Sequence, residues 1–175
     1  MQAESVLALL LAAQGVVGGV DTLLNHELIE HLPRRPSARR EIGLHSLRES
    51  IYGTLFAGLA FVEWHGAWAW ALPALLAAEV LVTASDEWIE NRTRVLPQNE
   101  RVMHVFLTLN LGLLVAVAIV MTPAWLAQPT SLTAVDRGWL GWLLLALGAA
   151  GFAWSLRDLL AWRRWGTVPF GDSPQ

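Results

Sequence analysis

Residues 99–121, NERVMHVFLTLNLGLLVAVAIVM, indicate the fold most directly, because a short polar opening runs into twenty residues without a charged side chain. A helix needs about 20 apolar residues to cross a bilayer. Four further apolar stretches lie at residues 6–24, 50–62, 67–83 and 139–156. The second of these is short unless its helix starts near Ile42, which places His45, Arg48 and Glu49 in its first turns. The sequence therefore predicts an all-α polytopic membrane bundle of about five transmembrane helices.

The composition excludes an ordinary soluble domain and several kinds of chemistry. Of the 175 residues, 54% are hydrophobic and only 15% are charged, and the mean hydropathy is +0.43. A soluble domain carries about 25% charged residues. The absence of cysteine excludes disulfides, thiol catalysis and iron–sulfur ligation. We expect one transmembrane domain over residues 1–165 and a disordered cytoplasmic tail over residues 166–175.

The arginines predict the orientation of the chain. All twelve basic residues are arginines, and eleven flank the first connection, the third connection or the end of the fifth span. Only Arg137 falls on the other side. Cytoplasmic loops are enriched in basic residues, so we expect the N-terminus outside and the C-terminus in the cytoplasm, as in a bacterial inner membrane. Tryptophans at both ends of the spans are typical of the aromatic belts at membrane interfaces.

The sequence repeats a pattern once. Residues 26–31, HELIEH, end the first span, and residues 86–91, DEWIEN, end the third at an offset of sixty. The pairs Glu41-x-x-x-His45 and Glu100-x-x-x-His104 then open the next helices at an offset of fifty-nine. This predicts two duplicated helical hairpins, at about residues 5–63 and 67–122, related by an axis along the membrane normal. A fifth helix follows at about residues 138–163.

Acidic residues and histidines gather at the predicted cytoplasmic ends of the first four helices. Residues three or four apart share one face of a helix, so each pair should point the same way. The candidate metal ligands are Glu27, Glu30, Glu41, His45, Glu87, Glu90, Glu100 and His104. Residues expected to orient these ligands or to replace them are His26, His31, Glu49, Asp86 and Asn91.

Charged groups at the edge of a membrane mark function. Carboxylates packed closely take up protons unless a positive charge neutralises them. Two divalent metal ions would do so, and mixed carboxylate and imidazole ligation suits iron, zinc or manganese.

The pattern resembles the ferritin-like di-iron carboxylate family, in which two helices each give a glutamate and two others each give a glutamate and a histidine. Residues 99–104, NERVMH, look like the Asn-Glu-Arg-Met-His motif of the membrane-bound alternative oxidases. Two features differ: the spacing here is Glu-x-x-x-His instead of Glu-x-x-His, and these helices are expected to cross the bilayer instead of lying on it. The resemblance implies two iron ions that activate dioxygen, with a lipophilic substrate or quinol and an electron donor as partners.

Other functions fit the same residues. A divalent-metal transporter would use the cluster as its transport site, with Asp21 and Glu79 continuing the path across the membrane. A zinc-dependent membrane hydrolase would use metal-bound water, and His45 with His104 could hold a haem b. The acidic helix ends could instead form ion pairs with the neighbouring arginines, or the chain could be a structural subunit. We expect contacts with membrane lipids and no binding of nucleic acid.

Overall fold

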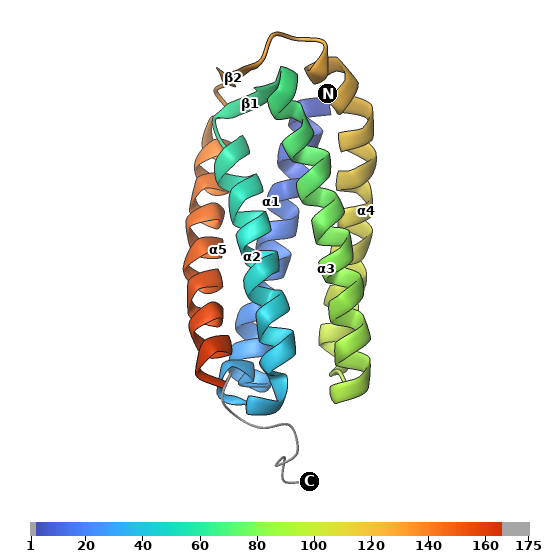
Figure 1. The fold of residues 1–175 in the computed structure, drawn as a ribbon, viewed down its shortest axis with the longest axis vertical. Coiled ribbons are helices and arrows are strands. Elements are labelled where there is room, and N and C mark those ends of the chain that lie inside the picture. Colours follow the sequence, from blue (N-terminus) through green and yellow to red (C-terminus); the bar gives the residue numbers. More distant parts are fainter. Residues whose placement is uncertain (1–2, 166–175) are drawn as a thin grey trace.

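The protein is a bundle of five long helices in a computed structural model that describes residues 3–165. The predicted cytoplasmic tail, residues 166–175, lies outside the described residues. The α-helices are α1 (Ala3–Asp21), α2 (Arg39–Leu59), α3 (Ala71–Thr93), α4 (Gln98–Leu126) and α5 (Trp139–Arg164). The helix of α1 continues without a break as the π-helix η1 (Thr22–Ile29). The predicted all-α class is confirmed (Figure 1).

Four helical segments in the described part of the chain are long and apolar enough to cross a membrane. They are Ala3–Ile29, Gly66–Thr93, Gln98–Leu126 and Trp139–Arg164. The helix α2 does not meet the same criterion, because the first half of its sequence is charged. Since Glu41 and His45 of this half are buried, those polar groups face the bundle interior. A fifth crossing by α2, the duplication of the hairpins and the orientation of the chain stay predictions.

The helices form a ring. The helix α2 packs against α5 and α3, and α4 packs against α3 and α1. The helix α5 also contacts α1 and closes the ring. The approach of α2 to α5 is close: a Cβ on Gly148 would lie 2.9 Å from the backbone nitrogen of Ala57. Small residues at such contacts are typical of helix pairs in membranes. Ser46 and Ser155 add a reciprocal pair of hydrogen bonds, each hydroxyl donating to the other residue's carbonyl at 2.8–2.9 Å.

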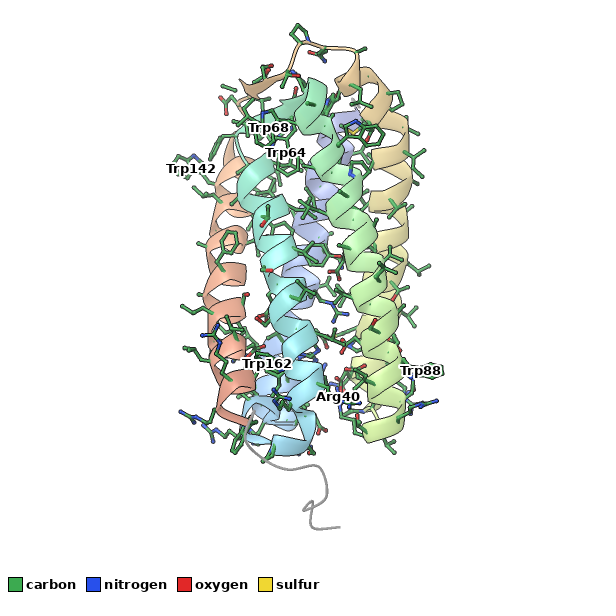
Figure 2. All side chains as sticks on the ribbon, in the orientation of Figure 1. Arg40, Trp64, Trp68, Trp88, Trp142 and Trp162 are labelled. Atoms are coloured by element: carbon green, nitrogen blue, oxygen red, sulfur yellow. The ribbon has the colours of Figure 1, made fainter. Side chains whose placement is uncertain are left out.

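Short irregular segments close the two ends of the bundle. One end has the antiparallel strands β1 (Val62–His65) and β2 (Ser131–Ala134) and the 3₁₀ helix η4 (Gly66–Trp70). The other end has the 3₁₀ helices η2 (Leu32–Arg34) and η3 (Pro36–Ala38). Figure 2 shows Trp64, Trp68 and Trp142 near the first end and Trp88 and Trp162 near the second. Trp64 is buried and donates to the carbonyl of Gly58, so it packs inside the cap.

The two halves of the bundle interior differ in polarity. A single apolar cluster fills the half nearer β1 and β2, with Leu11, Leu55, Leu72 and Leu114 among its fully buried members. The buried acids and histidines of η1, the first half of α2, the second half of α3 and the start of α4 lie in the other half. The fold thus places the candidate ligands together at one end.

Candidate metal centre

The π-helix decides which side chains of the first helix face the interior. A π turn joins residues five apart, and such turns are frequent at functional sites. In η1 the wider turn continues to Glu30, whose N–H donates to the carbonyl of Asn25 at 2.8 Å. As a result Asn25 and His26 are buried, while Glu27 and Glu30 lie at the side of the cluster.

Glu27 of η1 and Glu30, the residue that follows η1, both pair with arginines outside the cluster. Glu27 forms an ion pair with Arg157 of α5, and Glu30 accepts from Arg35 at 2.6 Å. His31 follows in a left-handed conformation with φ of 50° and is exposed. The structure therefore brings His26 into the centre and leaves Glu27, Glu30 and His31 at its margin.

Six acidic and imidazole side chains come together as two overlapping groups. The first group is His26, Glu90, Glu100 and His104, and the second is Glu41, His45 and Glu90. Within each group, one potential ligand atom per residue lies within 4.8 Å of the others. Glu90 belongs to both groups, so the two groups lie side by side and have one carboxylate in common. The predicted pairs on α2 and α4 both contribute, one to each group.

The histidines are held by carboxylates. The Nε2 atom of His45 lies 3.2 Å from Asp86 Oδ2, and the Nε2 atom of His104 lies 3.3 Å from Asp21 Oδ2. The Nδ1 atom of His104 lies 3.2 Å from Glu87 Oε1. Hydrogen bonds of this kind fix the orientation of metal-binding imidazoles and raise their basicity. Asp86 and Asp21 thus occupy orienting positions, and Glu87 contacts the centre through His104.

The guanidinium of Arg94 occupies the space between three of the carboxylates. It donates to Glu41 at 2.8 Å, to Glu90 at 3.0 Å and to Glu100 at 2.9 Å. Burial alone lowers the pKa of Arg94, but the hydrogen bonds to Glu100 and Glu41 outweigh it and raise that pKa above its usual range. Arg94 therefore stays charged and neutralises part of the acidic cluster.

A second guanidinium lies deeper in the bundle. Arg48 donates to Glu79 at 3.1 Å and to Asp86 at 2.8 Å. Because Asp86 also contacts His45, the cluster continues through Asp86 and Arg48 to Glu79. Ion pairing of the acidic helix ends with arginines, one of the alternatives that the sequence offers, is present in the structure at Arg48 and Arg94. The sequence does not identify these two arginines as members of the cluster. The position of Arg94, four residues after Glu90, was the available signal, because that spacing allows an ion pair on one helix face.

Within the two ligand groups, two buried atoms lack the hydrogen bond that such atoms normally have. They are Nε2 of His26 and Oε2 of Glu90, and the latter lies 3.5 Å from Nδ1 of His104. Although Nε2 of His26 is 3.3 Å from Glu100 Oε1, the two atoms form no well-directed hydrogen bond. An imidazole nitrogen and a carboxylate oxygen are both metal ligands, so the residues present fit a divalent ion at this point.

The remaining predicted residues lie at the edges of the centre. Asn91 is exposed, and its side chain donates to the carbonyl of Glu87. Glu49 faces a cavity that also reaches His26 and His45.

Comparison of the chain with protein-family models, curated proteins and solved structures gives no match in any of the three. Any functional conclusion must therefore come from the residues themselves.

Proposed function

We propose that this chain is an integral membrane oxidoreductase that holds two iron ions at one end of its bundle and acts on a lipophilic substrate. The main observation is the sharing of Glu90 by two groups of candidate ligands, each with at least one histidine. Carboxylate-rich ligation with one or two imidazoles per metal is the arrangement of di-iron carboxylate centres. Zinc or manganese could fill the same positions by ligand type.

The balance of charge supports divalent ions. Apart from Asp158, which pairs with Arg157, the buried acids of the described chain are Asp21, Glu41, Glu79, Asp86, Glu90 and Glu100. Two guanidiniums, those of Arg48 and Arg94, bond directly to members of this set. Six carboxylates with two guanidiniums leave an excess of negative charge, which divalent ions would neutralise. Uncompensated charge in a low-dielectric interior is strongly unfavourable.

The protein's residues have separate roles in this proposal. Glu90 would be a ligand common to the two ions, and Asp86 and Asp21 would keep His45 and His104 in the ligating orientation. Arg94 holds the carboxylates together in the metal-free chain and would give up part of these contacts to bound ions. Two ferrous ions would supply the activation of dioxygen. The adjoining apolar core excludes water from the centre.

The distribution of polar groups favours an enzyme over a metal transporter. A transport path needs polar groups along the whole crossing. Among the described residues, the ionic cluster ends at Glu79. Beyond it, a hydrogen bond that Asn110 donates to Gln14 is the next polar contact between helices. From there to the strands β1 and β2, apolar side chains dominate the buried core. The path offered by Asp21 and Glu79 therefore covers only part of the bundle.

Oxygen consumption tests the proposal. Anaerobically purified protein is loaded with ferrous iron, exposed to dioxygen and followed with an oxygen electrode and by optical spectroscopy. We expect one rapid oxidation event in the wild type and in Glu27→Gln, because Glu27 pairs with Arg157 outside the centre. Glu90→Gln should lose it. Equal oxygen uptake by Glu27→Gln and Glu90→Gln, or no oxygen uptake by the iron-loaded wild type, would refute the oxidoreductase proposal.

A further inference from the structure

A cavity of about 220 Å³ adjoins the candidate metal centre. Three histidines of the centre, His26, His45 and His104, form part of its wall. The remaining wall exposes mainly apolar atoms, including those of Phe56 and Leu147. It also carries charged side chains, those of Asp21, Arg48, Glu79, Asp86 and Glu87. An apolar cavity of about 150 Å³ in another protein takes up benzene. The volume here therefore suffices for a substituted six-membered ring or a comparable length of alkyl chain.

The cavity reaches the outer surface beside α1. Its wall there includes Gly18 and Gly19, and the lining residues Gly19, Leu23 and Ala150 are exposed. A Cβ on Gly19 would meet nothing within 4 Å, and a Cβ on Gly18 would meet only Leu107, at 3.8 Å. Because Gly18 and Gly19 have no side chains, this part of the wall is open. Since Gly19 lies within a candidate membrane span, the opening would face lipid.

Six polar atoms in the cavity wall are buried without a hydrogen-bond partner. Three of them, His26 Nε2, Glu79 Oε2 and Asp86 Oδ1, belong to the ionic cluster. The other three lie outside it and are Glu49 Oε2, Tyr52 OH and Trp154 Nε1. Glu49 and Tyr52 are three residues apart on one face of α2, and Trp154 comes from α5. Buried polar groups in proteins are nearly always paired, so these three indicate a ligand that brings polar atoms of its own.

The chemistry of the three groups suits a hydroxyl. An indole N–H can only donate, a carboxyl oxygen can accept, and a phenol can do both. A hydroxyl can accept from Trp154 and donate to Glu49. An ammonium would have no lone pair for Trp154, and a hydrocarbon would leave all three groups unpaired.

We propose that this cavity binds a lipophilic alcohol or phenol, which enters from the bilayer beside Gly19 and hydrogen-bonds through its hydroxyl to Glu49, Tyr52 and Trp154. The apolar body of the ligand lies against Phe56 and Leu147. The role of this ligand as the substrate rests on the proposed function, but its binding does not require a metal.

Binding of small fluorinated aromatics tests the inference. The chain is placed in lipid nanodiscs, and saturable binding of 4-fluorophenol is followed by ¹⁹F NMR, with empty nanodiscs correcting for partition into lipid. Fluorobenzene lacks the hydroxyl, and 4-fluorobenzoate replaces it with a charge. We expect one 4-fluorophenol site per chain and at least tenfold weaker binding of both analogues.

Two matched variants locate the site. Gly19→Leu fills the opening and should weaken 4-fluorophenol binding at least tenfold. Gly112→Leu adds the same side chain at an exposed helical glycine that also has nothing within 4 Å and does not line the cavity, so binding should be unchanged. Trp154→Phe should reduce the preference for 4-fluorophenol over fluorobenzene.

The outcomes separate this inference from the metal proposal. Wild-type binding that survives chelator treatment, with the predicted losses in the variants, supports the cavity inference whether or not the chain holds iron. Equal binding by Gly19→Leu and Gly112→Leu, or equal affinity for 4-fluorophenol and fluorobenzene, would overturn it even if the chain proves to hold two metal ions.

Discussion

Replacement of Arg94 by glutamine should lower the stability of the metal-free protein and raise its affinity for metal ions. The guanidinium bonds to Glu41, Glu90 and Glu100, whose side chains are all essentially buried. Removal of one partner from a buried ionic network costs about 3–5 kcal/mol, because the other charges are left uncompensated. With two divalent ions in place, the metal neutralises the same carboxylates. The loss should then fall to about 1 kcal/mol, the net value of an ordinary hydrogen bond.

The difference between the stability lost by the metal-free chain and that lost by the metal-loaded chain equals the gain in free energy of metal binding. A gap of about 2–4 kcal/mol corresponds to an increase in affinity between about thirtyfold and several hundredfold, since 1.4 kcal/mol is a factor of ten. Competition with a chromophoric chelator measures the affinity for ferrous iron under anaerobic conditions. Thermal unfolding with and without metal measures the stability of each form. A ligand that binds only the folded chain raises its stability, so the two measurements check each other.

Arg35→Gln is the matched control. Arg35 also pairs with a glutamate, Glu30, but its side chain is 47% exposed and the pair lies outside the centre. Exposed pairs contribute about 0–1 kcal/mol, so this change should leave both stability and metal affinity nearly unaltered. If Arg94→Gln weakened iron binding, or destabilised the metal-free and metal-loaded chain equally, the carboxylates would be a structural ionic network and the reasoning would be refuted.

Two further substitutions test the orientation of a ligand and the packing of α5. Asp86→Asn removes the carboxylate that contacts both His45 and Arg48, and it should lower metal affinity about 10- to 100-fold, measured by the same chelator competition. It should also destabilise the chain in thermal unfolding, because Arg48 loses one of its carboxylates. Unchanged metal affinity would contradict the orienting role of Asp86. Gly148→Leu pushes a side chain against the backbone of Ala57 and should destabilise the bundle by about 1–3 kcal/mol in thermal unfolding, whereas Gly112→Leu should not; equal stability of the two variants would contradict the close α2–α5 contact.

The sequence predicted the parts of the centre that lie on regular helices. Glu41 with His45 and Glu100 with His104 are one turn apart on α2 and α4, and the structure brings each pair into a ligand group. The 3.6-residue period is reliable there because both helices are continuous through the pair.

The first helix could not be predicted in the same way. Its last eight described helical residues form the π-helix η1, so faces computed for an α-helix do not apply to Glu27 and Glu30. Nothing in HELIEH distinguishes a π turn from an α turn, and His26 was therefore placed beside the centre instead of in it. The matching segment of α3 stays α-helical, and there Glu90 is buried within the centre.

The role of Arg94 was also beyond the sequence. Positive charge near a membrane boundary has a sufficient explanation in topology, and spacing alone does not reveal that one guanidinium contacts acids from three helices. Folding of the connection between α3 and α4 is what turns Arg94 inward. Long-range ionic contacts of this kind depend on the packing of whole helices.

The metal content of the purified protein tests the central claim most directly. Elemental mass spectrometry of detergent-purified chain should find about two iron ions per chain in the wild type and in Glu27→Ala, whose carboxylate lies outside the two groups. Glu90→Ala should lose both ions, because that carboxylate is shared by the two positions. A metal-free wild type, or a Glu90→Ala variant with full metal content, would contradict the account.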